Sequence, residues 1–208
     1  VEQYDQIKAA LWCQGPGNVG FEALGKILTG EVNPSGRTSD TFIYDMTAAP
    51  WWNNWEATHY SNMEDMAVEG MNFRMAQTYY PSFTNYVEGI YVGYKFYETA
   101  DDEGAIDYDA TVQYPFGYGL SYTTFAQEMS DLTVNDGEIT FDVTVTNTGD
   151  VAGKDVVEVY YNPPYTNGGI EKATTNLLDF ETTQMLEPGA TEPLTITYDA
   201  VDKASYDV

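Results

Sequence analysis

Carboxylates are the most abundant groups in this chain that can do chemistry, with 33 Asp and Glu against 8 Lys and Arg in 208 residues. Two carboxyl groups that flank one bond can hydrolyse it, one as general acid/base and the other as nucleophile or base. Spacing alone selects no such pair, and each carboxylate is expected to be solvated or structural. The least ordinary ones lie in an aromatic middle segment: Glu56, Glu64, Glu69 and Glu88.

Other reactive residue types are scarce. The single cysteine, Cys13, excludes an internal disulfide and a cysteine-based zinc site, and it is expected to be an inert core thiol because it ends an apolar run. The single histidine, His59, has no cysteine or serine partner at a telling spacing. Residues 101–104, with Asp107 and Asp109, lack the residue order of a calcium-binding EF-hand loop, so no metal site is expected.

A glycine-rich loop offers nucleotide binding as an alternative. Gly15–Gly20 matches G-x-G-x-x-G between a predicted strand and a predicted helix. Pro16 removes an amide that a pyrophosphate would need, and the expected acidic residue falls at Asp40, at the start of the next strand instead of its end. Gly20–Lys26 also imitates a phosphate-binding loop, but Ile27 stands where Ser or Thr would hold magnesium.

Charge and composition exclude two classes of partner. A net charge of −25 argues against nucleic acid, whose phosphates require clustered Lys and Arg, and against an anionic membrane surface. No run of 18 apolar residues is present, so no membrane span is predicted. With 43% hydrophobic and 15% aromatic residues the chain can build a packed core, and the acidic residues are expected to coat it.

The elements that would position these groups begin with a predicted strand–helix–strand unit. Residues 7–13 form an apolar run typical of a buried parallel strand, and residues 21–28 have helical spacing that ends at Gly30. Residues 41–44 are the second predicted strand. One such unit cannot cover both faces of a parallel sheet, so segments outside this chain are expected to complete it.

Periodicity weakens between residues 46 and 106, where aromatic side chains crowd together. Residues 86–97 are predicted as either a helix or a packed extended segment, and residues 114–122 as a turn-rich linker. A predicted irregular loop in this segment carries three tryptophans: Trp51, Trp52 and Trp55.

After residue 125 the apolar residues alternate with polar ones. Ile139, Phe141, Val143 and Val145 show the period of two that is typical of strands, and the pattern returns in residues 157–161 and 194–198. Strands at this spacing predict an antiparallel β-sandwich, although about five candidates are found where an immunoglobulin-like sandwich has about seven. Both ends are therefore expected to be cut, and the exposed sheet edges are expected to make the isolated chain dimerise or pack on the segments it lacks.

Four stretches in series resemble motifs of glycoside hydrolase family 3, the β-glucosidase and β-xylosidase family. Two further stretches in the last third resemble recurring turns of that family's fibronectin type III-like domain. The four motifs are Pro16–Gly30, Asn33–Arg37, Tyr86–Lys95 and Pro115–Tyr122, and the two turns are Val145–Gly149 and Leu186–Gly189. One departure is Thr38-Ser39-Asp40, where the family usually has L-P-x.

The resemblance implies α/β plus all-β architecture: the tail of an α/β sandwich domain, followed by an incomplete immunoglobulin- or fibronectin III-like antiparallel β-sandwich. The implied divisions are residues 1–45 for the α/β tail, 46–113 for an aromatic connecting segment, 114–125 for a linker and 126–208 for the β-sandwich.

The family's reaction is retaining hydrolysis of a terminal β-glycoside without a cofactor. The resemblance places its Asp nucleophile on a barrel, and its Glu acid/base upstream of the glycine-rich loop, so no catalytic residue is assigned here and the chain is expected to be inactive alone. Its expected partners are the barrel and the rest of the α/β sandwich, and a neutral glycoside is the expected substrate because the acidic surface repels anionic glycans.

Two roles remain open for the tryptophan loop. Trp51, Trp52 and Trp55 are candidate substrate-binding residues that would stack on the aglycone side of the pocket, and the alternative is packing between domains. For the whole chain, the rival to a scaffold within a glycosidase is a non-catalytic carbohydrate-binding or interaction module.

Overall fold

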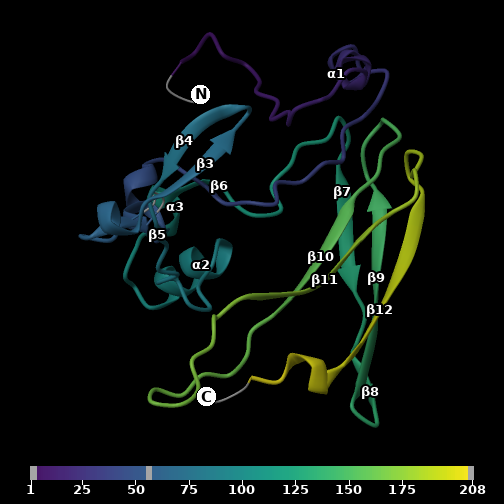
Figure 1. Ribbon diagram of the computed structural model, residues 1–208. Helices are drawn as coiled ribbons and strands as arrows, with labels where there is room; N and C mark the ends of the chain where they lie inside the picture. Colours follow the sequence, from purple (N-terminus) through teal and green to yellow (C-terminus); the bar gives the residue numbers. More distant parts are fainter. Residues whose placement is uncertain (1–3, 55–57, 206–208) are drawn as a thin grey trace.

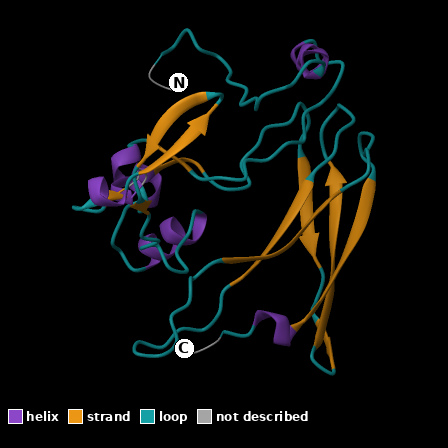
Figure 2. Ribbon diagram, in the orientation of Figure 1, coloured by secondary structure: helices purple, strands orange, loops and turns teal. Residues whose placement is uncertain are grey.

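The computed structural model describes residues 4–54 and 58–205 (Figure 1). Strands predominate, and the helices are short (Figure 2). None of the described helices is long and apolar enough to cross a membrane. The short 3-10 helices are η1 (Met46–Ala48), η2 (Trp52–Asn54), η3 (Met63–Met66) and η4 (Ala200–Lys203).

Two antiparallel sheets make up the second half of the chain. The larger has the strand order β12-β9-β7, with β8 also paired to β9, and the smaller pairs β10 with β11. Figure 1 shows the strands of both sheets in the same part of the molecule. The strands are β7 (Phe125–Met129), β8 (Thr133–Asn135), β9 (Glu138–Asn147), β10 (Val156–Tyr161), β11 (Asn176–Thr182) and β12 (Thr191–Asp199).

One apolar core holds these sheets together. Phe141, Val143 and Val145 point inward from β9 at every second position, as the alternation predicted. The register pairs Phe141 with Ile196 and Val143 with Leu194 across β9 and β12. The second sheet adds Val157 and the following loop adds Leu186 to the same cluster. The period-two pattern therefore identified the strands that build the core.

The helix predicted over residues 21–28 is confirmed as α1 (Gly20–Leu28). It ends where Gly30 takes a φ of 78°, a left-handed conformation that glycine adopts without a steric penalty. Glu22 and Lys26 form an exposed i,i+4 ion pair of 3.0 Å along it.

The strand predicted over residues 7–13 is wrong. This segment forms no ladder, most of it is exposed, and Cys13 is exposed instead of buried in a core. The second predicted strand exists as β1 (Phe42–Ile43), but it pairs antiparallel with β6 (Val112–Tyr114), so the described residues contain no parallel strand–helix–strand unit. A strand requires a neighbour for its backbone groups, and no described segment offers one to residues 7–13.

The aromatic middle segment is more regular than its sequence predicted. β3 (Val68–Asn72) and β4 (Met75–Tyr79) form a hairpin, and β2 (Thr58–His59) pairs with β5 (Ser82–Phe83). Of the stretch predicted as helix or extended segment, only the end is helical. The helices here are α2 (Tyr94–Asp102) and α3 (Tyr108–Thr111).

Candidate functional site at the junction of the two halves

The turn Asn33–Arg37 lies where the two halves of the chain meet, and Asn33 connects three segments there. Its side-chain oxygen accepts hydrogen bonds from the Ser121 hydroxyl at 3.0 Å and from the Tyr122 amide at 2.8 Å. Its side-chain nitrogen donates to the Ala152 carbonyl at 3.1 Å. One amide group thus ties the first half to the linker and to the loop between β9 and β10.

A buried ion pair joins the same turn to the β-sheets. Arg37 Nη2 lies 2.7 Å from Asp155 Oδ1, with side-chain exposures of 17% and 7%. The other carboxylate oxygen of Asp155 accepts a hydrogen bond from Gln127 of β7 at 2.8 Å, and the Asp155 amide donates to the Thr183 hydroxyl at 3.0 Å. Asp155 therefore fixes the turn relative to both sheets.

Close backbone approach at the junction depends on glycine. A Cβ at Gly119 would lie 2.3 Å from the Gly36 carbonyl oxygen, and one at Gly153 would lie 2.6 Å from the side-chain Nδ2 of Asn33. Real Cβ atoms essentially never approach another heavy atom this closely. A side chain at Gly119 would therefore push against the Gly36 backbone, and one at Gly153 would displace the Asn33 side chain from the Ala152 carbonyl.

Aromatic rings continue the junction from α2 to β10. The Tyr94 ring packs on Phe116 of the linker with centroids 4.8 Å apart and meets Tyr160 of β10 at 5.9 Å. The Tyr94 hydroxyl accepts a hydrogen bond from the Leu177 amide, and the Tyr160 hydroxyl donates to Glu158, both at 2.7 Å.

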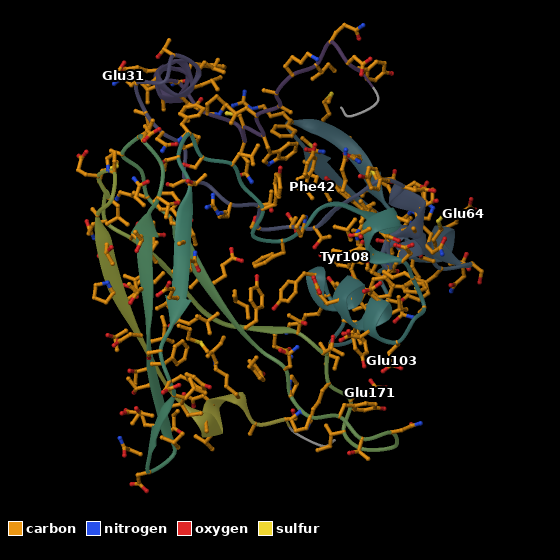
Figure 3. The ribbon with its side chains drawn as sticks, turned by 180° about the vertical axis from the view of Figure 1, so that it is seen from behind. Glu31, Phe42, Glu64, Glu103, Tyr108 and Glu171 are labelled. Carbon is orange, nitrogen blue, oxygen red and sulfur yellow. The ribbon has the colours of Figure 1, made fainter. Side chains whose placement is uncertain are left out.

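Burial raises the pKa values of these phenols. For Tyr94 and Tyr97 burial is the main cause. For Tyr160 the hydrogen bond to Glu158 adds to burial, and for Tyr108, which starts α3 beside α2, Glu98 has the same effect (Figure 3). These tyrosines therefore stay protonated in the folded chain at pH values at which a solvated tyrosine already ionises.

The candidate substrate-binding tryptophans are only partly placed. Trp51 and Trp52 are half-buried, and their rings pack at 6.3 Å with an interplanar angle of 52°. Asn54, which follows them, hydrogen-bonds through its side chain with the backbone of Asn85. Trp55 lies outside the described residues. The structure brings Trp51 and Trp52 together, and their contact with a substrate stays a prediction.

The carboxylates singled out by sequence lie on separate elements. Glu64 is exposed in η3 at the outer edge of the first half (Figure 3), and Glu69 accepts a hydrogen bond from Thr78 across the β3–β4 hairpin at 2.8 Å. Glu88 is half-buried and contributes to the raised pKa of Tyr97. Glu56 lies outside the described residues. Each described carboxylate thus faces solvent or has a local partner.

Metal ligation finds no support in the part of the chain that is described. Within residues 4–54 and 58–205, no group of three or more His, Cys, Asp or Glu is placed to hold an ion. His59 is exposed, and its Nδ1 lies 3.3 Å from the Pro81 carbonyl.

Sequence reasoning identified the turn Asn33–Arg37 as a motif and missed its partners. Asp155 is 118 residues from Arg37 along the chain, and Gln127 lies in β7, most of whose residues are exposed. No spacing rule connects such positions, because their proximity is created only when the two halves dock.

Comparison with known proteins gives a consistent result. The model of the "Glycosyl hydrolase family 3 C-terminal domain" matches residues 1–122. Beta-glucosidase A of Butyrivibrio fibrisolvens is 36% identical over 98% of this chain, and a beta-glucosidase of Ruminococcus albus is 34% identical over 96%. The chain spans 23% and 18% of the length of these two relatives.

Solved structures agree with the sequence relatives. A beta-glucosidase from Paenibacillus barengoltzii superposes with a TM-score of 0.70 and 30% identity, over 90% of this chain and 17% of that one. Beta-glucosidase 3B from Thermotoga neapolitana, solved in complex with glucose, gives a TM-score of 0.64 and 33% identity over 88% of this chain and 22% of that one.

Proposed function

The chain belongs to glycosyl hydrolase family 3, and from that membership we propose that it forms the C-terminal scaffold of a retaining β-glycosidase acting on terminal β-glucosides or related neutral glycosides. The predicted family is confirmed by the comparisons. The similar proteins named above are beta-glucosidases, which is what suggests the substrate class.

One observation carries the proposal: nearly the whole chain matches relatives of which it covers about a fifth. Retaining hydrolysis requires two carboxyl groups about 5–5.5 Å apart around one bond. We assign both to segments that correspond to the remainder of the relatives, a barrel and the rest of an α/β sandwich. The role of this chain is then to complete the second domain and brace it.

The junction supports a bracing role. Asn33, Arg37 and Asp155 lock the first half of the chain to the β-sheets through hydrogen bonds and one buried ion pair. A rigid connection of this kind would hold the first half in a fixed orientation toward its partners. In this proposal residues 1–45 complete the α/β sandwich, residues 46–113 connect, residues 114–125 link, and residues 126–208 are a fibronectin III-like sandwich.

The tryptophan loop is assigned a position near the substrate. Trp51 and Trp52 form a packed pair, and rings of this size can stack on the apolar faces of sugars or aglycones. We include Trp55 in this proposal as the third tryptophan of the loop.

A chimera tests the scaffold role. In one variant of the Butyrivibrio fibrisolvens enzyme the matching region is replaced by this chain, and in a second, the truncated relative, that region is deleted. The folded chimera is expected to hydrolyse an aryl β-glucoside, and the truncated relative is expected to be inactive. Folding of both proteins is checked by gel filtration and circular dichroism. A folded chimera without activity, or a truncated relative with full activity, would contradict the proposal.

A further inference from the structure

A groove separates α2 from the loop that joins β10 to β11, which lies below α2 in the view of Figure 1. Its volume is about 630 Å³, within the range of roughly 300–1,000 Å³ that is usual for small-molecule sites. The residues that line it are Tyr91, Thr99, Asp102, Glu103, Asn162, Pro163, Tyr165, Asn167, Lys172 and Thr174.

Hydrogen bonds hold the walls of this groove in place. The Thr99 hydroxyl of α2 accepts from the Thr174 amide at 3.1 Å, and Asn162 donates to the Thr174 carbonyl at 2.7 Å. Lys172 donates to the Pro164 carbonyl at 2.9 Å, which closes the loop on itself. The groove is therefore formed by a braced loop against a helix, and a ligand would not have to order it first.

Two tyrosines, Tyr91 and Tyr165, are among the residues that line this groove. Tyr91 precedes α2 and is half-buried, and its partial burial together with the charge of Glu171 raises its pKa. Tyr165 belongs to the β10–β11 loop and is 47% exposed. Such rings offer flat apolar surface with a polar tip, which suits a ligand that has an apolar face and hydroxyl groups at its edge.

Polar groups at the rim are free to bind a ligand. The side chains of Asn167, Asp102 and Glu103 make no hydrogen bond to the described part of the chain. An amide group and two carboxylates can together donate hydrogen bonds to the hydroxyl groups of a ligand and accept hydrogen bonds from them. The residues that line the groove include two carboxylates, Asp102 and Glu103, and one cation, Lys172, so an anionic ligand would be repelled. Glu103 and Glu171 lie on the same side of the molecule (Figure 3).

We propose that this groove binds a neutral saccharide, with one or two pyranose rings stacked on Tyr91 and Tyr165 and hydroxyl groups hydrogen-bonded to Asn167, Asp102 and Glu103. The site lies between the two halves of the chain and uses none of the tryptophans assigned to the substrate pocket. It does not depend on the proposed hydrolytic role, because binding is measured on the 208-residue chain alone.

Calorimetric titration of that chain tests the proposal. Cellotetraose, laminaritetraose and xylotetraose serve as neutral probes, digalacturonate as the anionic probe and choline as the cationic one. Saturable binding of at least one neutral tetrasaccharide and none of digalacturonate is expected. Failure of all three neutral probes to bind would overturn the proposal, and so would tighter binding of choline, which would show that the carboxylates select a cation.

Variants locate the binding. Tyr165→Ala should lower the affinity for the neutral saccharide at least about tenfold, because it removes a stacking surface. Asn167→Ala should lower that affinity at least about threefold, because it removes a hydrogen-bonding group. Both residues are exposed in a loop, so the urea unfolding midpoint should stay unchanged. The matched control is Tyr86→Ala, an 83% exposed tyrosine outside the groove, which should bind as tightly as the parent chain. Affinity unaffected by Tyr165→Ala and Asn167→Ala would place the saccharide elsewhere and refute the assignment.

Discussion

The ion pair between Arg37 and Asp155 should contribute most among the described charges to the stability of the chain. Arg37→Met removes the guanidinium and keeps the apolar stem, leaving the Asp155 carboxylate, at 7% side-chain exposure, with Gln127 as its remaining side-chain partner. Removing one member of a buried pair costs about 3–5 kcal/mol. Because the Arg37 side chain is 17% exposed and water reaches part of it, a loss of about 2–4 kcal/mol is expected.

Urea unfolding followed by intrinsic fluorescence measures this loss. A double-mutant cycle with Asp155→Asn isolates the pair, and a coupling energy of about 1.5–3 kcal/mol is expected, the range for hydrogen bonds to charged groups. The matched control is Glu22→Gln in the exposed Glu22–Lys26 pair of α1, whose side chains are 77% and 40% exposed. That change should cost less than about 0.5 kcal/mol.

Two results would contradict this role of the ion pair. If the free energy of unfolding of Arg37→Met lies within about 0.5 kcal/mol of that of the parent chain, water replaces the guanidinium at Asp155 without penalty. A coupling energy near zero, with both single variants destabilised, would mean that each residue acts through other neighbours.

Four further outcomes are expected. First, the contribution of buried tyrosines to the free energy of unfolding should be constant below pH 10 and should fall as the pH rises above 10, because these tyrosines have pKa values above the ordinary value of 10 in the folded chain and ionise more easily once unfolded. Urea unfolding midpoints measured against pH, together with tyrosinate absorbance, check this expectation. The tyrosines concerned are Tyr91, Tyr94, Tyr97, Tyr108 and Tyr160. Gly119→Ala should cost about 1–3 kcal/mol in urea unfolding, because its Cβ would meet the Gly36 carbonyl, whereas Gly25→Ala, with open space in α1, should be neutral or stabilising. Trp52→Ala in the active chimera should raise KM if the ring stacks on substrate; unchanged kinetics with lower stability would contradict this role. Light scattering should show the isolated chain as a dimer, since large apolar side chains such as Phe73 and Trp12 are exposed, and a monodisperse monomer would contradict that expectation.

Three strands of the second half, β9, β10 and β12, could be predicted because their signal is local, whereas the positions of β7, β8 and β11 were not predicted. Phe141, Val143 and Val145 alternate with polar residues, and this period of two shows one buried face whichever strand is the neighbour. The end of α1 could be predicted from an equally local signal, since Gly30 takes the left-handed conformation that follows many helices. The strand predicted for residues 7–13 was wrong for the opposite reason. An apolar run indicates burial but does not supply a partner, and none of the described segments pairs with it.

The junction could be predicted only in part. The Asn33–Arg37 turn was recognised as a motif, but its function as a connector depends on Ser121, Ala152 and Asp155, which are distant along the chain. The groove between α2 and the β10–β11 loop had no sequence signal, because it arises from the docking of a helix onto a loop some 75 residues away. Long-range contacts of this kind are fixed by the whole fold and not by any local pattern.

In the proposed role, this chain is a scaffold and carries no hydrolytic centre of its own. Its rate of hydrolysis of an aryl β-glucoside, measured beside an equimolar sample of the intact Butyrivibrio fibrisolvens enzyme, tests this most directly. We expect a rate for the chain that equals the buffer background. Turnover by the chain that disappears when one of its own carboxylates is replaced, as in Glu88→Gln, would contradict it.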